Sequence, residues 1–287
     1  MTLNFKQLLL GITAGSALAI LAYTTIPAFP NEKPTMTVYK QQAAELLKSI
    51  AVTVSHWPTS IPTNISSTTL PLQMVWTVLS LSCNPFQRDQ LKSIRCVCLQ
   101  DGDFVVVHTD YNFFGPKVGF DNFRFEDGKI VEHWDNLQAT AAKPSPSGHT
   151  MIDGPTRVSG LDKTEANKTL MQTYMDDLLD GHKDKFSSYF DGNNYIQHNP
   201  RVADNLTGLF AGLGALAKQG LAVKYDRVHK VFGEGNFVLV VAEGSFGDHS
   251  ASYYDLYRIQ NGKIAEHWDT VELIPPRAEW KNPNGKF

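Results

Sequence analysis

Two residues near the C-terminus, His267 and Asp269, have the types and spacing that acid–base chemistry needs. They lie in the run 264–273, and residues two apart in an extended strand share a face, here an otherwise apolar one with the two side chains roughly 7 Å apart. A carboxylate among apolar walls loses hydration, which raises its pKa and makes it a better general base near neutral pH. His267 could share the proton or orient a substrate oxygen. The alternative is a structural hydrogen-bonded pair, or a pair that faces solvent.

A second polar group is the segment 195–200, which reads Tyr-Ile-Gln-His-Asn-Pro. Pro200 disfavours helical angles at Asn199, so the segment is predicted to be extended or a turn between two helices. Such a segment can point Gln197 and His198 towards a sheet. The alternative is a helix-capping turn in which Asn199 or Asp204 satisfies backbone N–H groups.

Metal and nucleic-acid chemistry have little support in the sequence. The nine histidines form no HxxxH pair, and Cys96 and Cys98 form a C-x-C without a partner pair, so no metal or other cofactor is expected. The formal charge of −3 leaves no basic patch for nucleic acid.

The elements that would position these residues are three helices followed by a run of strands. Apolar spacing predicts helices over 164–179, 186–189 and 206–216, and β-rich runs with a tight turn at Asn261-Gly262 predict the strands. Both alternating sets of the run 237–242 are apolar, which favours a closed, cone-like sheet. We therefore expect an α+β fold in which helices close a pocket against a cone-shaped, curved antiparallel sheet.

An internal repeat relates residues 101–138 to residues 234–272. Gly102 corresponds to Gly235, Gly128 to Gly262, and the sequence Glu-His-Trp-Asp recurs at 132–135 and 266–269. We interpret the chain as tandem copies at 37–138 and 161–275, the first incomplete. A Pro-, Ser- and Gly-rich linker at 139–160 would join them, and 276–287 would form a tail.

The first copy lacks the sequence features expected before residue 101. Residues 52–99 contain no Gly, Ala, Glu or Tyr, yet hold all three cysteines of the chain. Reading one base earlier can restore a segment resembling 195–200. We therefore hypothesise that about residues 52–99 are an out-of-frame translation; genuine divergence is the alternative.

The first thirty residues differ from the rest of the chain. Lys6 precedes a long apolar run that ends near Pro27 and Pro30. This pattern predicts an export signal or a membrane anchor, hence a secreted, periplasmic or anchored protein. If translation starts at Met36 instead, a cytoplasmic protein is expected.

The segments 195–204, 235–241 and 253–269 together resemble the SnoaL-like polyketide cyclase family. That family belongs to the cystatin-like cone superfamily, with nuclear transport factor two and ketosteroid isomerase. The resemblance implies a curved sheet around a deep apolar pocket, often in a dimer, and aldol ring closure without metal or cofactor. Carried over, the base would be Asp269, with His267 and His198 as polar partners in the pocket.

Three functions follow as hypotheses. The first is a cofactor-independent lyase or isomerase for a small hydrophobic carbonyl compound, with Asp269 taking a proton α to the carbonyl and His267 or His198 stabilising the enolate. The second is a non-catalytic module that binds such a ligand, in which Tyr195, Gln197 and Asn199 would matter as ligand contacts. The third is a structural or partner-binding domain whose pocket is filled by its own side chains, with packing between copies or in a homodimer.

Overall fold

The structure is a computed structural model that describes residues 36–55, 97–112, 115–182, 184–192, 194–280 and 283–287. Contacts between residues divide the chain into 1–34 and 35–287, and every described residue belongs to the second unit. The predicted signal or anchor, Cys96 and most of the segment 52–99 lie outside the described residues. No helix of the described part is long and apolar enough to cross a membrane.

The C-terminal part of the chain forms a five-stranded sheet in the order β5-β9-β8-β7-β6. Neighbouring strands are antiparallel, except that the short β5 runs parallel to β9. The strands are β5 (Ile196–Gln197), β6 (Val223–Glu234), β7 (Phe237–Phe246), β8 (His249–Gln260) and β9 (Lys263–Leu273). Because β5 is the segment that precedes Pro200, the predicted extended conformation there is what the structure shows.

Turns and bulges give this sheet its curvature. Asn261 and Gly262 both have positive φ, 53° and 71°, as a two-residue type I′ hairpin turn requires. Register shifts interrupt β6 twice and β8 once, between Arg258 and Ile259. Each bulge adds a residue on one strand and bends it. The predicted α+β class with a curved antiparallel sheet is therefore confirmed.

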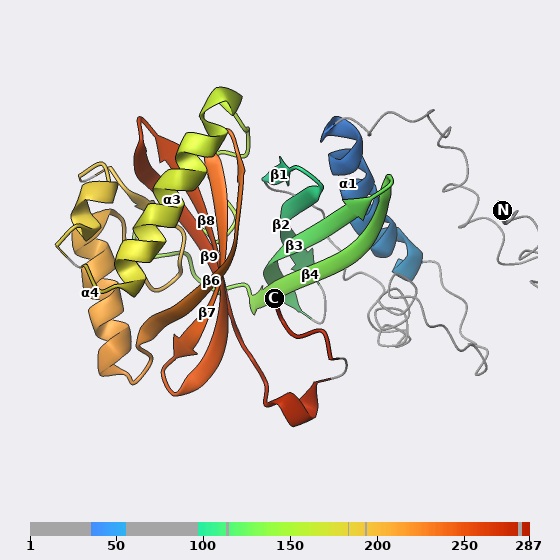
Figure 1. The fold of residues 1–287 in the computed structure, drawn as a ribbon. Helices are drawn as coiled ribbons and strands as arrows, with labels where there is room; N and C mark the ends of the chain where they lie inside the picture. Colours follow the sequence, from blue (N-terminus) through green and yellow to red (C-terminus); the bar gives the residue numbers. More distant parts are fainter. Residues whose placement is uncertain (1–35, 56–96, 113–114, 183, 193, 281–282) are drawn as a thin grey trace, which may run out of the picture. The chain divides into compact units, whose positions relative to one another are not determined.

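Helices cover one face of this sheet (Figure 1). They are α3 (Thr164–Leu179), the short 3-10 helix η5 (Phe186–Tyr189) and α4 (Asn205–Lys218), close to the ranges predicted from apolar spacing; the short η4 (Leu161–Lys163) precedes α3. α3 buries Met171, Tyr174 and Met175 on the side that faces β6 and β7. The apolar core lies between these helices and the sheet.

The other face of the sheet is covered by a second, four-stranded antiparallel sheet in the order β1-β2-β3-β4. Its strands are β1 (Cys98–Asp101), β2 (Phe104–Asn112), β3 (Pro116–Glu126) and β4 (Lys129–Ala139), and α1 (Met36–Ser55) packs on β1 and β2. Phe237, Leu239 and Val241 contact apolar side chains of this second sheet. One face of β7 is thus buried by the helices and the other by the second sheet. The apolar residues on both faces of 237–242 reflect this packing of two sheets, and not closure of a single sheet.

Contacts between the two sheets come in reciprocal pairs. The N–H of Leu137 donates to Glu272 Oε2 at 2.8 Å, and the N–H of Val271 donates to Gln138 Oε1 at 2.8 Å. These four residues correspond in pairs under the repeat, 137 with 271 and 138 with 272. Likewise, the N–H of residue 100 donates to the carboxylate of residue 234, and the N–H of residue 233 to that of residue 101.

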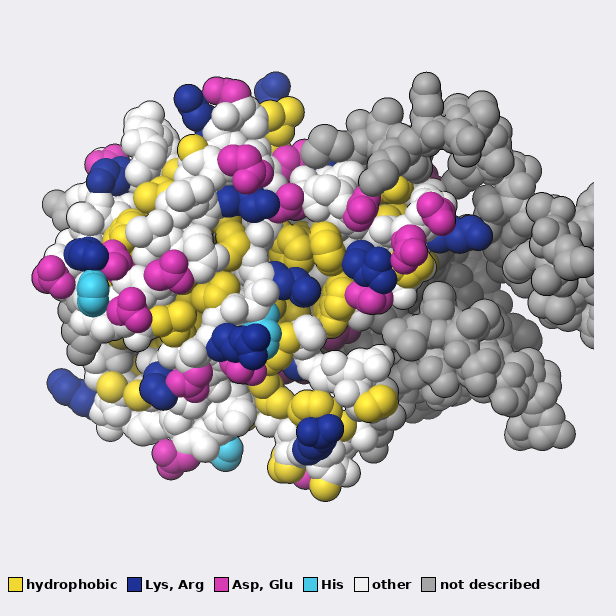
Figure 2. Space-filling view, in the orientation of Figure 1, with side chains coloured by type: hydrophobic (Ala, Val, Ile, Leu, Met, Phe, Trp, Pro, Cys, Tyr) yellow, Lys and Arg dark blue, Asp and Glu magenta, His cyan; other side chains and the backbone are white. Residues whose placement is uncertain are grey.

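The segment 139–160 is the one predicted to be a linker from its composition. Ala139 ends β4, and the rest of the segment packs against the sheets. Ser145 and Met151 are both 4% exposed, and the Trp268 indole N–H donates to the carbonyl of Asp153 at 2.8 Å. The C-terminal tail, which includes the 3-10 helix η6 (Arg277–Glu279), also makes contacts, since Phe287 stacks on His229. On the face shown in Figure 2, Lys and Arg side chains are interspersed with Asp and Glu.

Candidate active site

A cavity of about 970 Å³ lies between the helices and the five-stranded sheet. Side chains from α3, η5, α4, β6, β8 and β9 form its wall. Much of the wall is apolar, with contributions from Leu178, Phe186, Val202, Leu209, Leu213 and Val271. The volume is in the range of small-molecule sites, so the predicted pocket is present and is not filled by the protein's own side chains.

Strand β9 directs its two candidate residues into this cavity. His267, Asp269, Val271 and Leu273 all line it, while Trp268 packs in the core between the two sheets. This is the face that period-two alternation predicts. The sequence-based placement of His267 and Asp269 is therefore what the structure shows; their catalytic role stays a prediction.

Asp269 has one engaged and one free carboxylate oxygen. Oδ2 accepts a hydrogen bond from Asn199 Nδ2 at 2.7 Å, whereas Oδ1 is buried without a hydrogen-bond partner among the described residues. Burial raises the pKa of this carboxyl; nearby His267 and the Asn199 bond lower it, and the charge of Asp255 raises it. A carboxyl group that lines a cavity and is held by an amide is placed to take a proton from a bound molecule.

His267 lies between an amide and a second carboxylate. Its Nδ1 is 3.0 Å from Gln197 Oε1, and its Nε2 is 3.0 Å from Asp255 Oδ1. Gln197 Oε1 also accepts the backbone N–H of Asn199 at 2.9 Å, which identifies this atom as the amide oxygen because a backbone N–H can only donate. His267 Nδ1 must therefore donate to it. Nε2 lies opposite the carboxylate of Asp255.

Gln197 extends this chain of hydrogen bonds to a tyrosine. Its Nε2 donates to the hydroxyl oxygen of Tyr195 at 3.0 Å, in the cavity wall. Burial raises the pKa of Tyr195 well above its ordinary value, so the hydroxyl keeps its proton. Because that oxygen already accepts a bond from Gln197, its O–H is available to donate to a molecule in the cavity. Tyr195, Gln197 and Asn199 all line the cavity, as the ligand-contact hypothesis expects.

His198 is not a cavity residue, contrary to the prediction. Its Nε2 is 2.8 Å from Glu266 Oε1, its Nδ1 is 2.8 Å from the Thr150 carbonyl, and its ring stacks on Trp268. The reason is the period-two alternation of an extended segment: Gln197 faces the cavity, so His198 faces the opposite side of the sheet. The alternative of a capping turn is partly realised, since Asp204 Oδ1 accepts the N–H of Gln197 at 2.9 Å.

No protein-family model matches this chain, and no curated protein matches it. Similar solved structures include a candidate ketosteroid isomerase from Kribbella flavida DSM 17836 (18% identity, TM-score 0.31, 41% of this chain and 87% of that chain). Others are an NTF-2-like protein of unknown function from Burkholderia xenovorans LB400 (16%, 0.33, 43% and 99%) and an LEH-like epoxide hydrolase of M. tuberculosis (14%, 0.27, 38% and 85%). No reaction or ligand of this chain follows from similarities at this level.

Asp255 is the site residue that reasoning from the sequence missed. It is 1% exposed, binds His267, and accepts a hydrogen bond from the Tyr225 hydroxyl at 3.1 Å. A signal was present, because Asp255 corresponds to Asp121 in the repeat and the first sheet contains the same pair: His133 Nε2 is 3.0 Å from Asp121 Oδ1. A histidine and an aspartate that recur together in both copies indicate a pair in contact.

The first sheet holds only part of this arrangement. Asp135, which corresponds to Asp269, has a pKa raised by burial, and Lys286 lies 3.8 Å from it. His133 Nδ1 has no hydrogen-bond partner among the described residues, whereas its counterpart in His267 binds Gln197. The residues that would correspond to 195–200 fall outside the described part of the chain. The complete hydrogen-bond chain therefore belongs to the five-stranded sheet.

Two side chains of the cavity wall and the buried Asp255 beside them have the donor types of a metal site. One ligand atom each of Asp255, His267 and Asp269 lies within 4.8 Å of the others. Both nitrogens of His267, however, are already hydrogen-bonded, one to an amide oxygen that cannot donate. A metal ion here would have to break one of those bonds. The geometry fits a hydrogen-bonded acid–base group better.

Proposed function

We propose that this protein is a cofactor-independent lyase or isomerase that acts on a small, largely apolar carbonyl compound. The observation that carries the proposal is Asp269, which lies in the wall of a cavity of about 970 Å³ and is held there by Asn199. Burial raises the pKa of this carboxyl, and a base with a raised pKa accepts protons from carbon more readily. The SnoaL-like resemblance of the sequence suggests the same class of chemistry.

In the proposed step, the carboxylate of Asp269 takes the proton on the carbon next to the carbonyl. The electron pair of the broken C–H bond moves towards the carbonyl oxygen and gives an enolate. Tyr195 donates its hydroxyl hydrogen bond to that oxygen. The enolate then either takes the proton back from Asp269 at another carbon, which is isomerisation, or forms a carbon–carbon bond to a second carbonyl, which is ring closure. In ring closure the proton on Asp269 goes to the oxygen of that second carbonyl, which regenerates the base.

His267 acts in this proposal as a positioning residue. It donates to Gln197, which donates to Tyr195, so the hydrogen bonds of this chain run in one direction, from His267 to Tyr195 in the cavity wall. Successive hydrogen bonds of one direction strengthen one another. This departs from the hypothesis that His267 or His198 contacts the enolate directly, because His267 uses both nitrogens and His198 lies on the other face.

The test measures proton abstraction directly and needs no identified product. The full-length chain is incubated in D₂O with a panel of apolar ketones of increasing size, and deuterium at the α-carbon is measured by mass spectrometry. Asp269→Asn is expected to abolish the catalysed exchange, a loss of about 10²–10⁴-fold for a general base. Asp248→Asn, an exposed aspartate outside the cavity wall, is the matched control and is expected to exchange like the wild type.

The second candidate, a non-catalytic binding module, is supported by the aromatic and apolar wall of the same cavity. It predicts that a ketone of the panel binds, as saturation-transfer NMR would detect, without catalysed exchange. It also predicts that Asp269→Asn binds the ketone as well as the wild type does. Binding without exchange would therefore replace the enzymatic proposal with this one.

We further infer that the two sheets belong to tandem copies at 37–138 and 161–275. The reciprocal hydrogen bonds between corresponding residues support this inference, as does the recurrence of the His–Asp pair. The described residues do not include the segment needed to test the frame-shift hypothesis. Sequencing the transcript tests it, and an uninterrupted frame that encodes Cys83, Cys96 and Cys98 would exclude it.

A further inference from the structure

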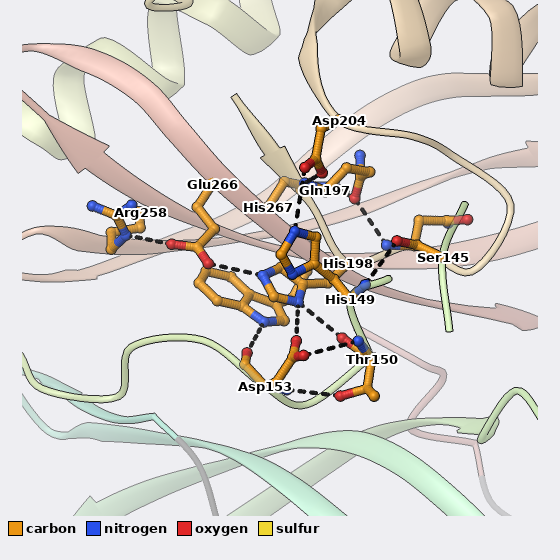
Figure 3. A network of polar contacts seen from close by, with 12 residues as sticks. Ser145, His149, Thr150, Asp153, Gln197, His198, Asp204, Arg258, Glu266 and His267 are labelled. Carbon is orange, nitrogen blue, oxygen red and sulfur yellow. Dashed lines mark hydrogen bonds and ion pairs between the residues drawn. The ribbon is translucent and has the colours of Figure 1, made fainter. Parts of the chain in front are cut away.

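Arg201 is a cation in the cavity wall that no acidic side chain of the described residues neutralises. Its guanidinium lies 5.8 Å from the ring centroid of Phe246, and both residues line the cavity. Within the described part of the chain, the backbone N–H of Arg201 makes a hydrogen bond, whereas its guanidinium makes neither a hydrogen bond nor an ion pair. Arg258, on the other face of the sheet, differs, since Figure 3 shows it directed at Glu266. An unpaired guanidinium in a cavity wall can bind an anionic group of a ligand.

The backbone of Arg201 is fixed relative to the proposed base. Its N–H donates to Asn199 Oδ1 at 2.9 Å, and the same amide donates from Nδ2 to Asp269 Oδ2 at 2.7 Å. The N–H of Val202 donates to the carbonyl of Asn199 at 3.1 Å and closes a turn. Pro200 restricts φ inside that turn. One side chain, Asn199, therefore holds both the base and the residue that carries the cation.

Gln138, on β4 of the first sheet, adds a hydrogen-bond donor to the same cavity wall. Its Oε1 accepts the N–H of Val271 at 2.8 Å. A backbone N–H can only donate, so this contact identifies the oxygen and leaves the two hydrogens on Nε2. Nε2 makes no hydrogen bond to any residue that the structure describes. The first sheet thus supplies an amide donor to the cavity of the second.

The cavity opens towards the C-terminal end of β9. His267 is 7% exposed and Leu273 is 49% exposed, and both line the cavity. Gln138 is anchored to Val271, which follows Asp269 in the direction of Leu273. Two residues of a strand span roughly 7 Å. The backbone that holds this amide therefore lies roughly 7 Å from that of the base, on the side of the opening.

The same opening carries cations. Phe246, under Arg201, ends β7, and pairing through β8 brings it to the same edge of the sheet as Leu273. Lys224 of β6 also lines the cavity at this edge, where it pairs with an exposed aspartate of its own strand. Among the described wall residues, Asp269 is the single carboxyl. Cations at the opening favour an anionic ligand group there.

We propose that the molecule bound in the cavity carries a carboxylate as well as its carbonyl group, and that Arg201 and Gln138 bind this carboxylate. The paired N–H donors of a guanidinium match the two oxygens of a carboxylate, and the amide of Gln138 adds a neutral donor. The carbonyl then lies at Tyr195 and the neighbouring carbon at Asp269, with an apolar chain leading to the opening. The substrate class is an aliphatic oxo acid. The assignment of the carbonyl end rests on the proposed function.

The test is calorimetric titration of the full-length chain with methyl-ketone acids of increasing chain length and with the methyl ester of each acid. An ester keeps the carbonyl and the chain but has no charge. We expect the best-bound acid to bind about 10-fold more tightly than its ester, the lower end for a charge-assisted hydrogen bond because the guanidinium is exposed. Arg201→Gln is expected to bind this acid and its ester with similar affinity.

Two further variants separate the amide from the charge and the site from the surface. Gln138→Glu keeps the oxygen that accepts from Val271 but replaces the amide N–H₂ with a carboxylate oxygen, so the ester is expected to bind more tightly than the acid. Arg277→Gln is the matched control for Arg201. Arg277 is also exposed and lies 5.8 Å from an aromatic ring, that of Trp280, but outside the cavity wall. This variant is expected to keep the wild-type preference for the acid.

Equal affinity of the wild type for each acid and its ester overturns the proposal, as does the absence of saturable binding of every acid. A preference for the acid that survives in Arg201→Gln overturns it as well. Deuterium exchange distinguishes this failure from that of the proposed reaction. Exchange of neutral ketones without a preference for acids removes the carboxylate site and leaves the reaction. A preference for acids without exchange of any compound supports the carboxylate site and makes the cavity a binding site.

Discussion

Gln197 is the residue whose replacement tests the hydrogen-bond chain most directly. It is 1% exposed; its oxygen accepts from His267 and from the N–H of Asn199, and its nitrogen donates to Tyr195. Gln197→Met keeps a similar volume but leaves two buried N–H groups without an acceptor. A buried donor without a partner costs about 1–3 kcal/mol, so the two give a loss of about 2–6 kcal/mol in the free energy of unfolding.

Urea unfolding followed by circular dichroism measures this loss. The matched control is Gln172→Met on α3, where an exposed glutamine binds only Asp176, and a surface change of this kind is expected to stay within about 0.5 kcal/mol of the wild type. If Gln197→Met were as stable as the control, the chain of bonds inferred here would not exist in solution.

Gln197→Glu separates the stability of the chain from its effect on exchange. A glutamate keeps the oxygen that accepts from His267 and Asn199, so the fold is expected to survive. It lacks the amide N–H₂, however, and Tyr195 would then donate to the new carboxylate and not to a bound ketone. Removal of an oxyanion donor costs about 10²–10³-fold in rate, so α-exchange is expected to fall steeply. Unchanged exchange in this variant would remove Tyr195 from the proposed mechanism.

Three further predictions concern Asp269 and Gly154. Deuterium exchange should rise with pH, because Asp269 must be ionised to act as the base. The midpoint should lie above the ordinary aspartate pKa of about 3.9, because burial raises the pKa of Asp269. Asn199→Ala removes a hydrogen bond that lowers this pKa, so the midpoint should move higher still. Because the pKa of Asp269 is raised in the folded state, its ionisation destabilises the fold. Asp269→Asn should therefore have a larger free energy of unfolding than the wild type at pH 7. This difference in stability should vanish below about pH 4, where the aspartate is protonated in both states. Gly154→Ala should cost about 1–3 kcal/mol for backbone strain plus the clash with Glu266, lowering Tm by about 2–4 °C per kcal/mol.

Each of these has its own control. A pH profile of Asn199→Ala that matches the wild type would mean that the bond to Asp269 is absent. Equal stability of Asp269→Asn and the wild type at pH 7 would mean that the carboxyl is well solvated. For the glycine, Gly148→Ala is the matched variant, because Gly148 has φ +91° but open space where a Cβ would be. The difference between the two alanine variants measures the contact alone.

The sequence predicts the local elements well because each depends on neighbouring residues. The helix over 164–179 and the turn at Asn261-Gly262 follow from apolar spacing and from the positive φ that the turn requires. The face of β9 that carries His267 and Asp269 follows from alternation alone. The same alternation along residues 195–199 places Gln197 and His198 on opposite faces. The prediction that both side chains lie in one pocket is therefore wrong for His198.

Apart from the repeat, the sequences of β8 and β9 do not reveal the partner of His267, because it depends on the register between the two strands. The two-residue turn pairs Gln260 with Lys263, and without interruption it would place Asp255 opposite Trp268. A bulge between Arg258 and Ile259 shifts the pairing by one, so that Asp255 lies opposite Asp269. A shift of one residue exchanges the faces of a strand. The extra residue is Ala265 on β9, nothing in its type marks a bulge, and the carboxylate beside His267 depends on it.

Alternation along β5 and β9 explains how one narrow part of a sheet can hold two polar groups of different character. On the cavity side, Gln197 links His267 to Tyr195 through hydrogen bonds that run in one direction. On the other side, His198 and Glu266 belong to a charged cluster that the segment 149–154 covers. Side chains on opposite faces share only the backbone between them, so each group can change by substitution without displacing the other.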